Sequence, residues 1–319
     1  MALINSVLGP LNTADLGFTL SHEHVVTASA GIQYTYPEFI NRSQVLEDGV
    51  TQLKAAYEEG IRTIVDVTTM DLGRDIRLLE EVSRRSGVNI IPATGVWLDI
   101  PQVFRVATPD MIAPLFIREI DVGIEGTGIK AGIIKVATAQ GTVTPDEEII
   151  LRAAARAERV TGAPISTHTS APERGGEDQV RILEEEGTDL SRVYIGHSND
   201  TADMDYLLGL LQKGVWLGLD RFQGSYVNPG TPSSEERIEV VKNLIDAGFG
   251  HKIMLSHDWS VRLLIRPLER RTYRAGLNPD GYLFISRTVV PRLKELGATD
   301  RDIENIFVNN PRRFFEGSQ

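Results

Sequence analysis

Residues 17–24 read GFTLSHEH, an apolar run that ends in a His-x-His pair. Successive side chains of an extended strand point to opposite faces, so His22 and His24 project from the same side and Glu23 from the other. Two imidazoles on one face make half of a metal site. A bare His-x-His pair is also a common incidental feature. A metal site therefore requires further ligands from the ends of later strands.

The chain around this stretch alternates between apolar, β-branched segments and segments of helical periodicity. Strands are predicted over residues 17–23, 62–68, 88–95, 131–136, 163–168, 192–197, 215–220 and 252–258, and helices over 44–60, 72–87, 109–125, 145–161, 174–187, 202–213 and 233–248. Eight strand–helix units in this order predict an α/β fold of the (β/α)8 TIM barrel type. A doubly wound open sheet would want a Gly-rich phosphate turn after an early strand, and the sequence has none. We expect one barrel domain over residues 1–319.

Several segments lie outside this alternation. Residues 3–12 predict a short hairpin that caps a barrel end. Residues 25–43 are irregular and aromatic and predict a long loop, which contains Tyr34, Tyr36 and Phe39. Residues 259–277 predict a second loop, followed by terminal helices near 278–296 and 300–315.

The composition is ordinary for a soluble globular protein, with 41% hydrophobic and 24% charged residues. A formal net charge of −11 argues against nucleic acid or an anionic membrane as the main partner. The absence of cysteine excludes disulfides and thiolate ligands, so a metal must use histidine, carboxylate or modified lysine. No apolar run approaches the roughly 20 residues of a membrane span, and the first residues lack the features of a signal peptide. We expect a cytoplasmic protein.

Polar side chains recur where the predicted strands end, which is where barrels of this kind carry their chemistry. The candidate metal ligands at these positions are His22, His24, Lys135, His168, His197 and Asp258. Four of the six histidines of the chain belong to this set. Each residue also has a plainer interpretation: a lone histidine can be a satisfied interior imidazole, and Asp258 can cap the segment that follows it.

Lys135 is the most informative member of the set, because it lies in the apolar strand Ile133–Val136. It must either point outward or be buried, and burial lowers the pKa of an amine. A neutral amine could form a Schiff base with a substrate carbonyl, or take up carbon dioxide to become a carbamate that bridges two metals. The Schiff-base alternative, an aldolase, would leave the strand-end histidines without a role.

These residues resemble the phosphotriesterase family of the amidohydrolase superfamily. The resemblance is carried by His22-Glu23-His24, by Lys135 in IKVA, His168 in THT, His197 in IGH and Asp258 in SHD, and it runs through essentially the whole chain to Asn310-Pro311-Arg312-Arg313. It includes both the organophosphate-hydrolysing phosphotriesterases and the phosphotriesterase-like lactonases.

The resemblance implies a binuclear centre. His22, His24 and Asp258 would hold the more buried divalent metal ion, and His168 and His197 the more exposed one. Carboxylated Lys135 and a hydroxide would bridge them, with Asp258 also accepting the proton of the hydroxide. Imidazole and carboxylate ligands suit zinc, and also cobalt, iron or manganese. The resemblance further suggests a homodimer, in which the aromatic residues of 25–43 could be buried; they could equally line the substrate pocket.

The substrate-binding residues divide between the two branches of the family. Trp97 matches the phosphotriesterases, whereas Arg221 matches the lactonases. The remaining candidates are Phe222, Tyr226, Trp259 and the apolar residues Leu263, Leu264 and Ile265, which could form an acyl-chain groove. We expect a hydrolase that opens acyl-homoserine lactones or related lipophilic lactones and also hydrolyses phosphotriesters such as paraoxon. The alternatives are a dedicated phosphotriesterase and, with less support, the aldolase or a non-catalytic barrel.

Overall fold

Eight parallel strands form the centre of the molecule. The structure is a computed structural model that describes residues 2–222 and 230–317. In chain order the strands are β3 (Phe18–Thr27), β4 (Ile61–Asp66), β5 (Asn89–Gly95), β6 (Ile133–Ala137), β7 (Ile165–His168), β8 (Val193–Ile195), β9 (Trp216–Leu219) and β10 (Ile253–Leu255). Each pairs with its neighbour in the chain. Two backbone hydrogen bonds connect the segment that follows the last strand to the first strand: Asp258 N–H donates to His22 O (3.1 Å), and His24 N–H to Trp259 O (2.8 Å).

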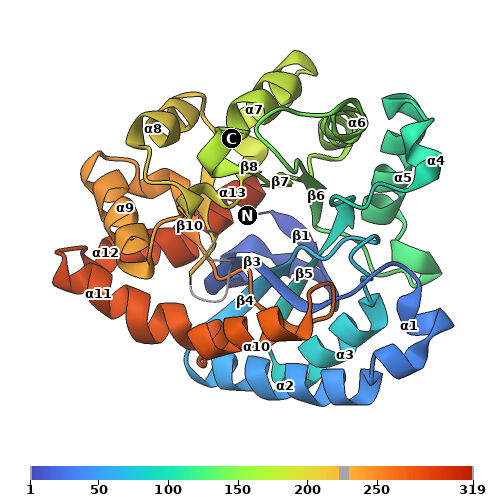
Figure 1. Ribbon diagram of the computed structural model, residues 1–319, viewed down its shortest axis with the longest axis horizontal. Coiled ribbons are helices and arrows are strands. Elements are labelled where there is room, and N and C mark those ends of the chain that lie inside the picture. The colour runs from blue at the N-terminus through green and yellow to red at the C-terminus, as the bar shows by residue number, and fades with distance from the viewer. Residues whose placement is uncertain (1, 223–229, 318–319) are drawn as a thin grey trace.

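A helix follows nearly every strand and packs on the outside of the sheet. These helices are α2 (Arg42–Glu58), α3 (Ile76–Ser86), α5 (Pro109–Asp121), α6 (Pro145–Thr161), α7 (Gly176–Glu185), α8 (Met204–Gln212) and α9 (Ser234–Asp246), with the short α1 (Ile32–Thr35) and α4 (Gln102–Arg105) in the loops. Figure 1 shows them as a ring around the strands. The (β/α)8 barrel expected from the sequence is therefore confirmed.

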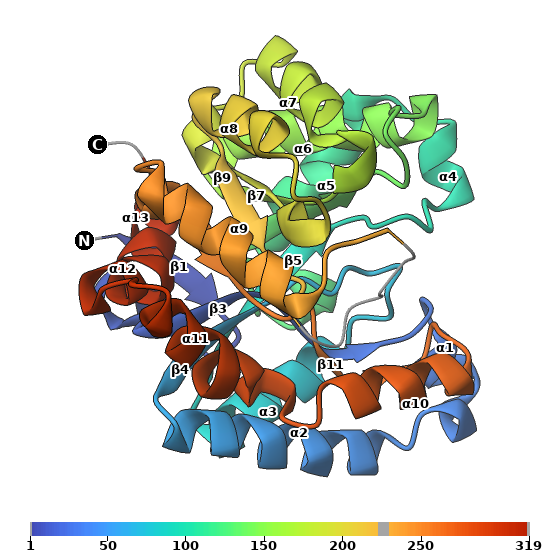
Figure 2. The same ribbon diagram turned by 60° about the vertical axis from the view of Figure 1, so that its left-hand side comes forward.

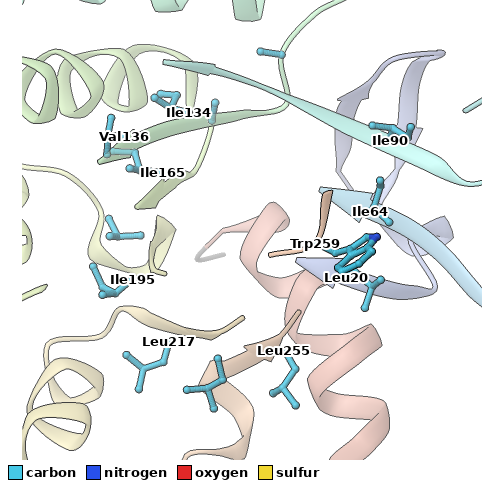
Figure 3. Close-up of a cluster of buried hydrophobic side chains, with 14 of the residues drawn as sticks. Leu20, Ile64, Ile90, Ile134, Val136, Ile165, Ile195, Leu217, Leu255 and Trp259 are labelled. Atoms are coloured by element: carbon cyan, nitrogen blue, oxygen red, sulfur yellow. The ribbon is translucent and has the colours of Figure 1, made fainter. Parts of the chain in front are cut away.

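The alternation of side chains along the strands separates two apolar clusters. Figure 3 shows the outer cluster, to which each barrel strand contributes: Leu20, Ile64, Ile90, Ile134, Ile165, Ile195, Leu217 and Leu255. Their chain neighbours belong to a second cluster: Val65, Ile91, Ile133, Tyr194, Trp216 and Met254. Because adjacent strand residues point to opposite faces, the second cluster faces the barrel interior. Lys135, two residues after Ile133, therefore also faces inward.

Strand β3 departs from this alternation by one residue. Leu20 pairs with Ile64 and Glu23 with Asp66, so three steps along β3 match two steps along β4. This extra residue is a β-bulge, which re-aims the side chains that follow it. Without the bulge, His22 and His24 would share the outward face of Leu20. The bulge is what directs both imidazoles into the mouth of the barrel.

The two ends of the chain meet at the other end of the barrel. The predicted hairpin consists of β1 (Leu3–Ser6) and β2 (Gly9–Asn12), which pair antiparallel. It lies against the starts of the strands, where Val7 N–H donates to Ile90 O (2.9 Å). The last helices are α11 (Val290–Glu295), α12 (Asp300–Glu304) and α13 (Asn310–Glu316), and Figure 2 shows α13 beside β1.

Two predicted loops contain regular structure. In residues 25–43, β3 continues to Thr27 and α1 follows. The prediction of a loop over 259–277 is wrong: β11 (Ser260–Leu263) adds a ninth parallel strand beside β3, and α10 (Leu268–Leu277) lies alongside α2 (Figures 1 and 2). A four-residue strand is too short to give a readable alternation, and the arginine-rich α10 has few apolar residues to mark a helical face.

Candidate active site

All six predicted ligands lie at the mouth of the barrel, close to one another. His24 Nε2 is 3.3 Å from Asp258 Oδ1, and His22 Nε2 is 3.8 Å from the same oxygen. The Lys135 amine lies 3.4 Å from His22 Nε2. On the opposite side, His168 Nδ1 and His197 Nε2 are 2.8 Å apart. The four histidines, which lie as far as 175 positions apart in sequence (197 − 22), thus converge because their strands end at one edge of the sheet.

Lys135 is the largest charged side chain buried in this cluster, with 1% of its surface exposed. Burial lowers the pKa of its amine to about 7, although the carboxylates of Asp220 and Asp258 oppose the shift. The amine donates to Thr167 O at 2.8 Å. A substantial fraction of Lys135 is therefore neutral near pH 7, and the neutral amine is the form that reacts with electrophiles.

Three of the histidines, His22, His168 and His197, are also held in their neutral form. Burial, reinforced by the charge of Lys135, lowers the pKa of His22 to about 3. Burial lowers the pKa of His197 as well, and burial with the neighbouring His197 lowers that of His168 well below its ordinary value. Neutral imidazoles keep a lone pair, which is the form that binds a metal ion.

Asp220, which follows β9, was not recognised from the sequence as a site residue. Its carboxylate lies 2.9 Å from His22 Nδ1 and 2.8 Å from His197 Nδ1, and also accepts from His197 N–H (2.8 Å). Burial would raise the pKa of this carboxyl group, but His22 and His197 hold it well below its usual value. The hydrogen bond to Asp220 fixes the proton of His197 on Nδ1, and the Asp220 charge 2.9 Å from His22 Nδ1 favours the same tautomer there, so each Nε2 faces the centre. Its position at the end of an apolar strand was the available signal.

Gly218 makes room for a second contact to Asp220. A Cβ at Gly218 would lie 2.2 Å from the ring of Tyr194. The Tyr194 hydroxyl donates to Asp220 at 2.9 Å and lies 3.0 Å from the Ser21 hydroxyl. Only glycine at this position allows the tyrosine to fill the barrel interior directly beneath the histidines.

The donor set suits metal ions. His22, His24 and Asp258 offer ligand atoms that lie within 4.8 Å of one another. His24 has its Nδ1 occupied by Thr68 Oγ1 at 2.8 Å, so its Nε2 is directed to Asp258. Two imidazoles and a carboxylate converging in this way, each oriented by a second polar group, are the ligands that zinc and similar cations take in proteins.

A cavity opens directly above this cluster. Beyond His22, His24, Lys135, His168 and Asp258, its walls are formed by Thr27, Leu72, Trp97, Arg221, Ser260, Leu263, Ile265 and Arg266. The Trp97 ring meets that of His168 edge-on, with centroids 5.6 Å apart. Arg221 Nε donates to Asp258 Oδ2 at 3.3 Å, and its guanidinium also pairs with Asp200. The cavity therefore joins two arginine side chains, Arg221 and Arg266, to an apolar wall.

The structure does not bring every predicted substrate-binding residue to this cavity. Phe222 is completely buried in the outer apolar cluster. Trp259 points outward too, and its indole N–H donates to Gln52 at 3.0 Å (Figure 3). Both side chains come one position after a residue that faces the cavity, and alternation sends them to the helix layer. Tyr226 lies outside the described residues. The aromatic residues Tyr34, Tyr36 and Phe39 are exposed and do not line the cavity.

Comparisons with known proteins agree with this architecture. The model of the Phosphotriesterase family matches residues 2–315. The "Phosphotriesterase homology protein" of Mycobacterium tuberculosis is 40% identical, with 99% of this chain and 98% of that protein covered. The "Aryldialkylphosphatase" of Saccharolobus solfataricus is 37% identical, with 96% of each covered. The solved structure titled "Structure of the phosphotriesterase from Mycobacterium tuberculosis" superposes with a TM-score of 0.92 at 40% identity, covering 99% of this chain and 98% of the other.

The fold and these relatives define a barrel hydrolase. More particularly, the chain belongs to the phosphotriesterase family. No helix within residues 2–222 and 230–317 has the length and apolarity needed to cross a membrane.

Proposed function

We propose that this hydrolase opens lipophilic lactones, such as acyl-homoserine lactones, and hydrolyses phosphotriesters of the paraoxon type as a side activity. The observation that carries the proposal is the pairing of two features in one cavity. Neutral imidazoles and Asp258 converge at its floor, and Leu72, Leu263 and Ile265 form an apolar wall beside them. Such a wall suits the acyl chain of a lactone.

We infer a binuclear centre from the donor set. His22, His24 and Asp258 would hold one divalent cation, zinc or a similar metal, and His168 and His197 the other. Lys135, carboxylated on its neutral amine, would contribute to both. Bound ions of this kind lower the pKa of a coordinated water and polarise the oxygen of a carbonyl or phosphoryl group.

Asp258 is the residue suited to move the proton. Burial raises the pKa of its carboxyl group, but the contact with His24 and the charge of Arg221 outweigh it and hold the pKa well below its usual value. Asp258 is therefore ionised at neutral pH, and its Oδ1 can accept the proton of the attacking water. Its Oδ2 is paired with Arg221 Nε at 3.3 Å, which holds the carboxylate at the cavity wall.

The same site can act on lactones and phosphotriesters because both reactions develop negative charge on an oxygen atom at the reacting centre. The tetrahedral intermediate of a lactone and the five-coordinate transition state of a phosphotriester each place negative charge on one oxygen. Arg221 supplies a fixed positive charge at the cavity wall, and Trp97 gives a flat apolar surface next to His168. Neither contact selects strictly for a carbon or a phosphorus centre.

The proposal is tested by assaying one purified preparation with a long-chain acyl-homoserine lactone and with paraoxon. We expect a higher kcat/KM for the lactone. A far higher kcat/KM for paraoxon would replace the proposal with the alternative of a dedicated phosphotriesterase. Metal analysis of the same sample checks for two ions per chain, and borohydride trapping of substrate on Lys135 would instead indicate the aldolase.

A further inference from the structure

Glu23 lies between His22 and His24 in the sequence, but its side chain points to the opposite face of β3. Its carboxylate is completely buried and does not line the cavity. Its Oε1 accepts from the Ser256 hydroxyl (2.7 Å), from His257 N–H (2.9 Å) and from His257 Nδ1 (2.7 Å). Its Oε2 accepts from Trp259 N–H at 2.7 Å. Four donors from residues 256–259 therefore converge on one side chain, and a buried carboxylate without a cationic partner requires donors of this kind.

The two backbone donors flank Asp258. Asp258 has a φ of +55°, a left-handed conformation that a residue with a Cβ rarely adopts. Such a conformation persists only where the surrounding structure imposes it. Here Glu23 holds the amide on each side of Asp258, and Asp258 N–H itself donates to His22 O. The strained turn is thus built on residues 22–24.

The contact extends to the outer layer of the barrel. His257 Nδ1 donates to Glu23, and its Nε2 accepts from Ile285 N–H at 3.0 Å. Both ring nitrogens are therefore engaged, which fixes the orientation of the ring. The segment that carries Asp258 is anchored on one side to β3 and on the other to the terminal helices.

We infer that Glu23 is a positioning residue: its carboxylate sets the backbone on both sides of Asp258 and so fixes the Asp258 carboxylate against His22 and His24. The effect of Glu23 on metal binding rests on the function proposed above. Removing the carboxylate releases the turn, lets the Asp258 side chain move away from the two imidazoles, and weakens retention of the ion at that group. Partners that orient a ligand in this way typically contribute about 10–100-fold to metal affinity.

The test compares Glu23→Gln with Glu147→Gln. Glu147 is a buried carboxylate that likewise accepts from two backbone amides, those of Ala139 and Thr144 (2.7 and 2.8 Å), but does not line the cavity. Each zinc-loaded protein is mixed with excess EDTA, and metal release is followed at a temperature where all variants are folded. We expect release about tenfold faster or more for Glu23→Gln, and a wild-type rate for Glu147→Gln.

Hydrogen exchange in the metal-free protein is the second readout. The amides of His257 and Trp259 should exchange at least about tenfold faster in Glu23→Gln, whereas Glu147→Gln should expose those of Ala139 and Thr144 instead. Glu23→Asp, whose shorter chain cannot span both amides, keeps the test usable if the glutamine variant does not fold. The inference would be overturned if Glu23→Gln released metal at the same rate as Glu147→Gln and its amides at residues 257–259 exchanged at the same rate as in Glu147→Gln. If the wild-type protein itself binds no zinc, the proposed function fails, and the exchange measurement alone decides the role of Glu23.

Discussion

The two sides of the candidate metal-binding cluster are supported very differently. On the β3 side, His22 is oriented by Asp220, His24 by Thr68, and the turn at Asp258 by Glu23. On the β7 side, the ring of His168 has a polar contact with His197 alone among the described residues, and it is only partly buried. Every residue of the β3 side is therefore held in place before any ion binds, whereas on the other side Asp220 holds His197 and His168 has no such support.

The hydrogen bond between His168 and His197 must break before an ion can bind between these two side chains. Asp220 accepts a hydrogen bond from His197 Nδ1–H, so His197 Nε2 is the acceptor and His168 Nδ1 is the donor of their 2.8 Å hydrogen bond. An ion bound between them would require His168 to give up this bond. Preorganised ligands bind more tightly because they do not pay for rearrangement, so the β3 side should bind its ion first and release it last.

The largest expected effect is acid destabilisation of the metal-free protein. The pKa of His22 is about 6.5 in the unfolded chain and about 3 in the folded one, because of burial and Lys135. Between these values the unfolded state binds more protons, so stability is complete above pH 6.5 and is lost as pH falls towards 3. The loss from His22 alone is on the order of 5 kcal/mol over that window. Urea unfolding at pH 7 and pH 4.5 should show about 3 kcal/mol of this loss, and His22→Asn should flatten the dependence.

Ligand removal tests the asymmetry between the two sides directly. His22→Asn should lower metal content and hydrolysis together, by more than about 100-fold in kcat, exceeding the effect of changing a supporting residue. His168→Asn should keep close to one ion per chain, because the β3 side is preorganised without it. Metal analysis and lactone assays on both variants supply the measurement. Full activity of His22→Asn, or equal metal loss in both, would contradict the comparison.

Asp220→Asn weakens both halves at once, since this carboxylate contacts His22 and His197. The amide keeps an acceptor but loses the charge that favours both imidazole protons on Nδ1. We expect metal affinity and kcat/KM to fall by about 10–100-fold, with most of the folded structure intact. Competition with a metal chelator and far-UV circular dichroism test the two statements. A variant with wild-type zinc affinity would show that Asp220 does not orient the ligands.

The smallest expected effect concerns the substrate wall, not the ligands. Leu263→Ala removes apolar surface from the cavity and should raise KM for a long-chain lactone about fivefold while leaving a short-chain lactone nearly unchanged. Leu268→Ala, five residues on, is the matched control because Leu268 is 66% exposed. If both variants change KM for the two lactones alike, the acyl chain lies elsewhere.

Much of this site could be predicted from the sequence because barrel geometry gathers strand ends. Five of the six predicted ligands could be named from their positions at the ends of apolar runs, and the sixth, Lys135, from its place inside one. The β-bulge in β3 could not, since it is defined only by the register against β4. Without knowledge of which strands face one another, Asp220 and Glu23 had no visible partners. Phe222 and Trp259 were predicted to line the substrate pocket, but their side chains lie in the outer apolar layer. The reason is related: a shift of one residue along an extended segment turns the side chain to the opposite face.

The ninth strand, β11, carries part of the cavity wall but none of the predicted ligands. Every predicted ligand precedes residue 259, whereas Leu263 and Ile265 of the cavity wall follow it, on β11 and the turn that leads to α10. β11 pairs with β3 and stands at the end of the sheet order. Substitutions, insertions or deletions in this segment can reshape the pocket without altering the spacing of any ligand. Substrate range can therefore diverge among descendants of this chain while the chemistry of the centre is inherited unchanged.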